Sequence, residues 1–313
     1  LANYRTALNN VRFESTAGSP GARTIAVCVV SVAAPTAGYV GTATLTDVES
    51  VIAPTPHVVL RGGNRAGSEF VRGGLGNDTL YGGSQTGTDL GHNILDYRFA
   101  SGSVTVDFTT GTSSGADGND QFSGFRSVLA GAGNDTLVGD AQDNFFDAGA
   151  GDDSISGGDG IDAVAYSFAM SGVTVNLATG TATGGGGSDT FSGNEYARGS
   201  AHADTLIGNS GDNLFQGRAG HDTIDAGAGN DTIHGGYGND SLTGGTGNDT
   251  FTWDAGAYNS SNEGVDLVTD FAIGDVLQFS TRLAAGSVTQ GDGTTVSGKG
   301  VQGQVSGGLT TLD

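Results

Sequence analysis

The sequence predicts an all-β fold, a parallel β-roll with irregular strand insertions and a C-terminal capping β segment. Three observations support this prediction: an acidic residue recurs every nine positions, an apolar residue stands two places after it, and glycines fill the positions between. The chain has 313 residues, of which 58 are glycine and only 4 are proline. A carboxylate and an apolar side chain thus share one spacing over many copies, which indicates a repeated structural unit.

The nine-residue units fall into two series and one earlier copy. The clearest copies read GGYGNDSLT at 235–243, GGTGNDTFT at 244–252 and GGLGNDTLY at 73–81. The positions that carry Asp, or Asn in its place, are Asp78, Asp135, Asn144, Asp153, Asp162, Asp204, Asn213, Asp222, Asp231, Asp240 and Asp249. The apolar positions two places further on are Leu80, Leu137, Phe146, Ile155, Val164, Leu206, Phe215, Ile224, Ile233, Leu242 and Phe251.

Each unit predicts a six-residue turn followed by a three-residue strand. In such a strand the middle side chain points away from its two neighbours, so the apolar residue faces inward and its neighbours face water. The glycines allow the positive φ angles that a tight turn requires. Two units then complete a coil of 18 residues with two facing parallel sheets, and the apolar residues fill the space between the sheets.

The same geometry predicts metal sites in the turns. Successive coils lie about 4.8 Å apart, so an Asp lies near the Asp 18 residues later, and both stay ionised only with a cation between them. Carboxylate and backbone carbonyl oxygens suit Ca²⁺ better than Mg²⁺, and Zn²⁺ prefers His or Cys. The expected pairs, which should hold several Ca²⁺ ions, are Asp135 with Asp153, Asn144 with Asp162, Asp204 with Asp222, Asn213 with Asp231, Asp222 with Asp240, Asp231 with Asp249, and Asp78 with Asp96.

An alternative is that these Asp side chains only make Asx turns with nearby backbone. For the strict nine-residue series we favour the metal. For Asp96, Asp120 and Asp189 the two interpretations remain open.

The repeat resembles the RTX nonapeptide, G-G-x-G-x-D-x-U-x, in which U is a large apolar residue. The resemblance covers about 59–252 and implies a right-handed parallel β-roll, the RTX solenoid, with Ca²⁺ in its turns. Some copies depart from the motif. Asn144 and Asn213 replace the Asp, and Ala130, Ala148 and Ala226 replace the first glycine. An amide brings an oxygen without a charge, so we expect weaker sites at the two Asn positions.

A longer repeat lies inside this region. The stretch DYRFASGSVTVDFTTGT at 96–112 recurs as AYSFAMSGVTVNLATGT at 165–181, which divides the region into units 91–159 and 160–228. Each unit begins with alternating apolar and polar residues, a pattern typical of half-buried strands. We therefore expect a roll that continues through these insertions but is distorted there.

The two ends of the chain differ from the repeats. Residues 4–30 resemble the last strands of a cadherin-like domain, as in large bacterial RTX adhesins, through Tyr4, Leu8, Val11 and Phe13 and the stretch GARTI at 21–25. Region 1–58 is therefore expected to be a cadherin-like remnant, and a separate N-terminal β layer is the alternative. Residues 253–313 are expected to cap the roll, since a solenoid needs a covered end. Within that cap, Asp266 and Asp270 are expected to help bind a last ion, and the covering residues are Leu267, Val268, Phe271, Ile273, Val276, Leu277 and Phe279.

Composition excludes several classes of function. The formal net charge is -22, which argues against nucleic acid and against an anionic membrane surface as partners. No apolar run is long enough for a transmembrane segment. Cys28 is the single cysteine, so no disulfide within the chain can stabilise the fold in place of the metal. The GTSSG stretch at 111–115 matches the G-x-S-x-G nucleophile motif but lacks a following helix pattern, and we expect no enzyme activity.

These features predict an extracellular calcium-binding structural segment of a secreted or surface bacterial protein, such as an adhesin, surface layer or scaffold, which folds on binding Ca²⁺. The RTX resemblance implies export by type I secretion. An alternative is the export and folding module of a secreted enzyme whose catalytic domain lies upstream. A carbohydrate-binding module would need an aromatic platform, for which Tyr81, Tyr237 and Trp253 are candidates. Calcium ions are the expected partners, and contact with a cell surface or with further copies of the chain stays open.

Overall fold

A computed structural model describes residues 41–44, 50–52, 58–61, 70–82, 93–253, 265–279, 288–289 and 295–296. Every regular element among them is a strand, which confirms the all-β prediction. No helix among these residues is long and apolar enough to cross a membrane. The residues that carry the cadherin-like resemblance lie outside the described ranges.

The chain divides into two compact units, which are described in turn. The first consists of Leu1–Val164 with Asp189–Gly193, and the second consists of Ala165–Ser188 with Asn194–Asp313.

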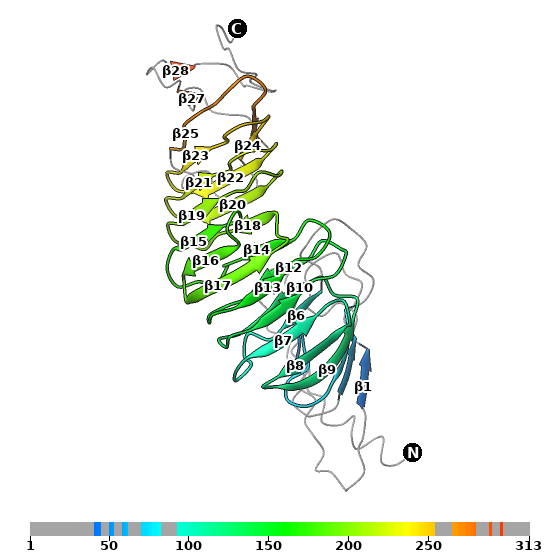
Figure 1. Ribbon diagram of the computed structural model, residues 1–313. Coiled ribbons are helices and arrows are strands. Elements are labelled where there is room, and N and C mark those ends of the chain that lie inside the picture. The colour runs from blue at the N-terminus through cyan, green and yellow to red at the C-terminus, as the bar shows by residue number, and fades with distance from the viewer. Residues whose placement is uncertain are drawn as a thin grey trace, which may run out of the picture. The chain divides into compact units, whose positions relative to one another are not determined.

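Two sheets of short strands form the first unit (Figure 1). One sheet has the order β1 (Gly41–Thr44), β3 (Val58–Arg61), β5 (Thr79–Tyr81), β9 (Gly118–Ser123), β8 (Thr112–Gly115), β7 (Val104–Asp107), β11 (Thr136–Val138), β13 (Ser154–Ser156) and then residues 189–192 of β17 (Gly187–Ser192). The other has the order β2 (Ser50–Ile52), β4 (Phe70–Arg72), β6 (Ile94–Asp96), β10 (Ser127–Leu129), β12 (Phe145–Asp147) and β14 (Ala163–Ala165).

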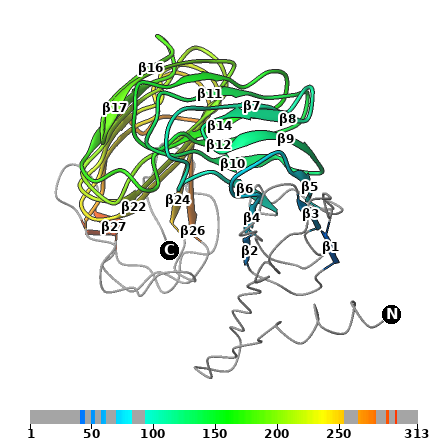
Figure 2. The ribbon, with the colours of Figure 1, turned by 90° about the horizontal axis from the view of Figure 1, so that it is seen from below.

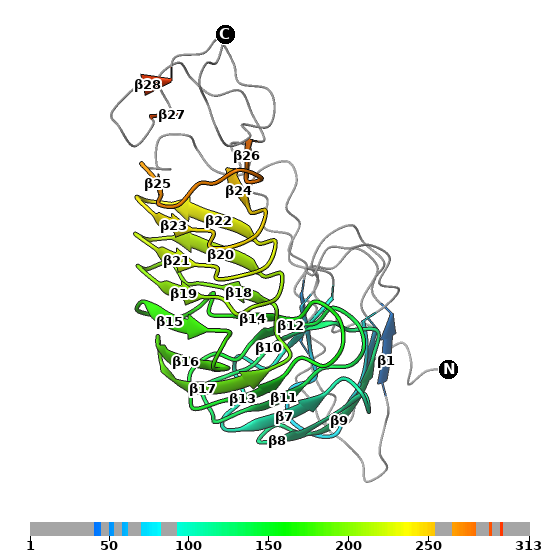
Figure 3. The same cartoon turned by 45° about the horizontal axis from the view of Figure 1, so that its top comes forward.

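The second unit repeats this arrangement more regularly (Figure 3). One sheet has the order β16 (Thr181–Gly184), β15 (Val173–Asn176), β19 (Thr205–Ile207), β21 (Thr223–Asp225), β23 (Ser241–Thr243) and β25 (Leu267–Val268). The other has the order β18 (Tyr196–Arg198), β20 (Leu214–Ala219), β22 (Thr232–Tyr237), β24 (Thr250–Trp253) and β26 (Val276–Phe279). Strands β27 (Val288–Thr289) and β28 (Thr295–Val296) pair only with each other.

The strand register confirms the predicted coil of 18 residues. Leu206 pairs with Ile224 and Ile224 with Leu242 in one sheet, while Phe215 pairs with Ile233 in the other. These pairings are parallel, and successive strands along the chain alternate between the two sheets. The chain therefore winds as a parallel β-roll.

The core contains the apolar residues that the repeat predicted. All eleven of them, from Leu80 to Phe251, are buried, and most have no exposed surface. Strand β21 shows the alternation clearly, because Ile224 is fully buried while Thr223 and Asp225 on either side are exposed. One inward residue in each nine thus makes a narrow core between the sheets.

Antiparallel hairpins form the irregular insertions. In the first unit β7 pairs with β8 and β8 with β9, and these three strands lie side by side in Figure 2. In the second unit β15 pairs antiparallel with β16. Strands β7 and β15 bury their two valines and expose the threonine between them, which confirms the predicted half-buried strands.

This insertion overturns one expected neighbour. Strand β5 pairs with β9, so Leu80 lies beside Phe122, and the N–H of Asp78 donates to Oδ1 of Asp120 at 2.8 Å. The pairing of Asp78 with Asp96 is therefore wrong. The coil after Asp78 contains the extra hairpin strands, so counting 18 residues ends in β6, which belongs to the opposite sheet.

The C-terminal segment extends the roll by one more coil. Leu242 pairs with Val268, and Phe251 pairs with Leu277. Phe271 packs against Phe251 with ring centroids 6.3 Å apart. Two residues expected to cover the coil end are exposed instead, namely Leu267 and Ile273, because they lie on the outward side of the added coil.

A second set of hydrogen bonds links the coils along the surface of the second unit. The N–H of Asn230 donates to Oδ1 of Asp212 at 2.6 Å, and the N–H of Asn248 donates to Oδ1 of Asn230 at 3.0 Å. On the other side, the N–H of Asn239 donates to Nδ1 of His221 at 2.8 Å. In each case the later coil donates to a side chain of the earlier coil.

Candidate metal sites in the turns

A ladder of aspartates runs along each row of turns. The N–H of Asp204 donates to Oδ1 of Asp222 at 2.8 Å, and the N–H of Asp222 donates to Oδ1 of Asp240 at 2.9 Å. The other expected neighbours also meet in this way: Asp135 with Asp153 at 2.7 Å, Asn144 with Asp162 at 2.7 Å, Asn213 with Asp231 at 2.7 Å, and Asp231 with Asp249 at 2.9 Å. The repeat spacing therefore places these side chains next to one another.

The ladder also includes four aspartates that the nine-residue count did not select. Oδ1 of Asp120 accepts from Asp78, that of Asp189 from Asp153, that of Asp266 from Asp240, and that of Asp275 from Asp249. Each of the four stands two residues before an apolar residue, as in the repeats, so the Asp-x-apolar pattern could have identified them without the count of nine.

The second carboxylate oxygen in five of these turns has no partner. Among the described residues, no hydrogen-bond donor reaches Oδ2 of Asp153, Asp222, Asp231, Asp240 or Asp249. Each of these aspartates is at most 3% exposed, so bulk solvent does not reach the oxygen. A buried carboxylate oxygen without a partner is costly, which indicates that a positive charge belongs beside it.

Some of these turns have a glycine close against this oxygen. A Cβ added to Gly217 would overlap both Oδ2 of Asp222 and the carbonyl oxygen of Gly235 in the next coil. A Cβ on Gly235 would likewise overlap Oδ2 of Asp240. The turns of Asp153 and Asp231 have Ala148 and Ala226 at the same position, so glycine there is not required in every turn. A set of carboxylate and backbone carbonyl oxygens fits Ca²⁺, with the carboxylate providing charge and the carbonyls completing the shell.

The pKa values of the ladder aspartates agree with this interpretation. Burial raises the pKa of Asp153 and of Asp222 to about 7, and neighbouring carboxylates add to the increase. Burial also raises the pKa of Asp231 and of Asp240 to about 6. Without a cation, the fold disfavours the charged form of these groups, and a nearby cation reverses that preference.

Four of the predicted positions have a different environment. Oδ2 of Asp135 accepts from the N–H of Gly131 at 3.2 Å, and Oδ2 of Asp204 accepts from the N–H of Ser200 at 2.6 Å. At the two amide positions, Oδ1 of Asn144 accepts from Asp140 and Oδ1 of Asn213 from Asn209, both at 2.8 Å. In each of these turns the N–H four residues earlier satisfies the side chain.

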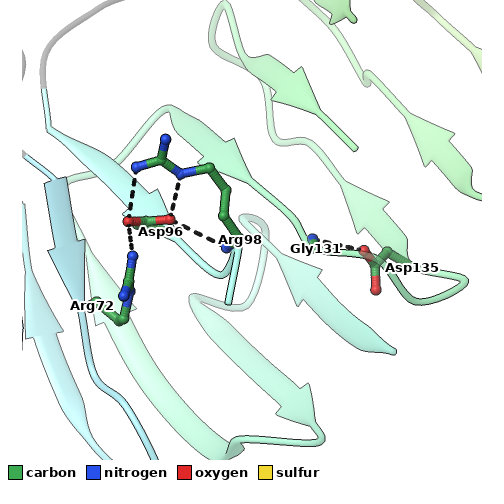
Figure 4. A network of polar contacts seen from close by, with 5 residues as sticks. All are labelled: Arg72, Asp96, Arg98, Gly131 and Asp135. Atoms are coloured by element: carbon green, nitrogen blue, oxygen red, sulfur yellow. Dashed lines mark hydrogen bonds and ion pairs between the residues drawn. The ribbon is translucent and has the colours of Figure 1, made fainter. Parts of the chain in front are cut away.

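Asp96 belongs to an ion-pair network and not to the turns (Figure 4). Its carboxylate accepts hydrogen bonds from Arg72 and from Nε of Arg98, the latter at 2.9 Å. Burial raises the pKa of Asp96, but the hydrogen bonds from Arg98 and Arg72 outweigh burial and hold it below its usual value. Asp96 is therefore held as a carboxylate by arginine.

Protein donors also satisfy the acidic residues of the C-terminal coil. Oδ2 of Asp266 accepts from Nε1 of Trp253 at 2.6 Å, and Asp270 accepts from the N–H groups of Gly244 and Gly245. Oδ2 of Asp275 accepts from the N–H of Ala272 at 2.7 Å.

Neither a metal cluster of side chains nor a nucleophile elbow is found in the described ranges. There, no group of three or more His, Cys, Asp or Glu side chains is arranged so that these side chains alone could hold a metal ion. Residues 111–115 of the GTSSG stretch fall in a hairpin turn and in β8, not before a helix. Ser113 is buried and bonds to the hydroxyl of Tyr97 at 2.7 Å.

The rows of aspartates and their buried carboxylate oxygens without donors indicate a calcium-binding parallel β-roll. The RTX calcium-binding nonapeptide repeat matches the chain in four copies, at residues 65–86, 129–164, 198–233 and 226–257. These segments belong to the RTX repeat family, whose nonapeptides bind Ca²⁺. The matches omit 87–128 and 165–197, which contain the hairpin insertions. No curated protein shows significant similarity to the chain.

Proposed function

We propose that this chain is an extracellular structural segment of a secreted or surface bacterial protein, folded and made rigid by Ca²⁺. The observation that carries the proposal is the set of buried Oδ2 atoms without donors in successive turns, at Asp153, Asp222, Asp231, Asp240 and Asp249. Buried carboxylate oxygens without donors favour an ion in the turns over a purely hydrogen-bonded turn.

The narrow core explains why the fold would depend on the metal. Each unit of nine contributes one fully inward apolar residue, while the chain carries a formal net charge of -22. Apolar burial of this kind must offset the entropy of ordering many glycines. A bound Ca²⁺ supplies positive charge beside the buried carboxylates, and its binding free energy then contributes to folding.

An extracellular location follows from the same dependence. The cytosol keeps free calcium low, whereas the external medium holds it at higher levels. A chain that needs calcium to fold would stay unfolded inside the cell and fold after export. The RTX family is typically exported by type I secretion, which is consistent with this order of events. A structural role in an adhesin, surface layer or scaffold requires no catalytic residue from this chain.

Circular dichroism of the full chain during a CaCl₂ titration tests the proposal, with MgCl₂ as the control. We expect a β spectrum that grows with calcium and not with magnesium, because Mg²⁺ requires a tighter octahedral shell. Metal analysis of the dialysed protein accompanies the titration. A β spectrum unchanged by EDTA, in protein that contains no calcium, would contradict the proposal.

A further inference from the structure

The turns fall into two classes by backbone conformation. In one class, which we call left-handed turns, the residues four and two places before the Asp both have positive φ. These pairs are Gly74 and Gly76, Gly149 and Gly151, Gly158 and Gly160, Arg218 and Gly220, Gly227 and Gly229, Gly236 and Gly238, and Gly245 and Gly247. In the other class, which we call closed turns, neither position has positive φ; they are headed by Asp135, Asn144, Asp204 and Asn213.

The two classes differ in how they satisfy the side chain at the head of the turn. In every closed turn, the N–H four residues earlier donates to that side chain, at 2.6 to 3.2 Å. In the left-handed turns of Asp153, Asp222, Asp231, Asp240 and Asp249, no described donor reaches Oδ2. In these five turns, the left-handed backbone conformation and the unsatisfied oxygen therefore occur together.

Arg218 shows that the left-handed turn is not merely a consequence of glycine. It stands where other turns have glycine, four residues before Asp222, and still has φ of 80°. A side chain in that region costs on the order of 1–2 kcal/mol. Gly131 gives the converse case, since it is a glycine four residues before Asp135 and has no positive φ. The surroundings of the turn, and not residue type alone, decide its class.

We infer that the ions occupy only the left-handed turns, and that the closed turns of Asp135, Asn144, Asp204 and Asn213 take no ion of their own. This inference rests on the proposed calcium binding. In a closed turn a backbone N–H already occupies the position beside the carboxylate or amide oxygen, and a cation placed there would face a hydrogen-bond donor.

Closed turns also have a consistent place in the chain. Asp135 and Asn144 belong to the first two nine-residue turns after the strands β7–β9, and Asp204 and Asn213 belong to the corresponding turns of the second unit. At the C-terminal end, Asp275 is likewise satisfied by protein donors. In the second unit, the turns that take ions thus lie between turns held by hydrogen bonds.

Native mass spectrometry of the full chain in calcium tests the inference by counting bound ions. We expect Asp222→Asn to lose at least one ion relative to the wild type. Asp204→Asn, the matched change in a closed turn, should lose none, because backbone N–H groups already donate to both carboxylate oxygens of Asp204 and leave neither for an ion. The reverse change, Asn213→Asp, should gain none although it adds a carboxylate.

Each outcome of the count has a clear meaning. Loss of an ion in Asp204→Asn, or gain of one in Asn213→Asp, overturns the inference while leaving calcium binding intact. An unchanged count in Asp222→Asn overturns it as well. A wild-type chain that binds no calcium overturns the proposed function itself. If circular dichroism shows that Asp222→Asn does not fold in calcium, Asp231→Asn provides the same comparison.

Discussion

Substitution of Gly217 tests how closely the turn of Asp222 is packed. In Gly217→Ala, the new methyl group would overlap Oδ2 of Asp222 and the carbonyl oxygen of Gly235. Neither oxygen can easily move away, because Oδ1 of Asp222 accepts the N–H of Asp204 at 2.8 Å and Gly235 lies within β22. The substitution should therefore strain the turn of Asp222.

The expected loss of stability comes from the added methyl group, which costs about 1–3 kcal/mol when it is inserted into a packed site. Loss of the ion is not part of this expectation, because Ala148 and Ala226 stand at the same position before Asp153 and Asp231. In excess calcium, Gly217→Ala should thus lower the free energy of unfolding by about 1–3 kcal/mol. Urea unfolding followed by circular dichroism measures this loss as a lower midpoint.

Gly211→Ala is the matched control. Gly211 is exposed, has no positive φ, and an added Cβ would lie 3.4 Å from Oδ1 of Asn209, an ordinary contact. Both substitutions reduce the freedom of the unfolded chain equally, so the control should be neutral or stabilising by about 0.4–1 kcal/mol. Equal urea midpoints for the two variants in excess calcium would refute the close packing of Gly217 against Asp222.

Three further predictions concern the core, an ion pair and the C-terminal turns. Phe215→Ala removes a fully buried ring and should cost about 3–5 kcal/mol in calcium, seen as a lower urea midpoint; a loss under 1 kcal/mol would contradict the core. Asp96→Ala leaves two arginines without their carboxylate and should cost about 3–5 kcal/mol. Because the folded pKa of Asp96 lies below 3.8, this difference should hold above that pH and shrink as acid protonates the carboxyl; a pH-independent difference would be inconsistent. Trp253, the single tryptophan, should sensitise emission from Tb³⁺ bound in place of Ca²⁺. The variant Asp240→Asn should weaken that emission. The control Asp212→Asn, at an exposed position, should leave the emission unchanged.

The regular part of the fold could be predicted from the sequence because one short pattern determines it. An Asp followed two places later by an apolar residue sets the turn, the inward side chain and the coil length together. This pattern correctly placed the neighbours of Asp204, Asp222 and Asp231 and the burial of all eleven apolar residues.

Counting residues failed where the coil length changes. The partner of Asp78 lies 42 residues later, at Asp120, because the hairpin lengthens that coil. Asp275 was not selected because it stands outside the nine-residue series, although its carboxylate meets Asp249. A fixed period carries no information about an insertion, whereas the local Asp-x-apolar pattern survives it.

The distinction between closed and left-handed turns could be predicted only in part from the sequence. Glycine four residues before the Asp or Asn marks most left-handed turns, but this rule fails at Gly131 and at Arg218. Two of the closed turns differ in the coil that precedes them. The turns of Asp135 and Asp204 follow hairpin strands, and Oδ1 in each accepts from a hairpin valine, Val104 or Val173. The donor thus comes from a residue 31 positions away in each case.

The hydrogen bonds between coils run in opposite directions at adjacent residues, and this has a mechanical consequence. Between one pair of coils, the N–H of Asn213 donates to Asp231 in the later coil, while the N–H of Asn230 donates to Asp212 in the earlier coil. A coil pulled away from its neighbour by force must therefore break both bonds, together with its strand pairing. Each coil that detaches frees 18 residues, which extend to at most roughly 60 Å. Under tension the regular part of the roll would unfold one coil at a time, and each coil would add the same length to the extended chain.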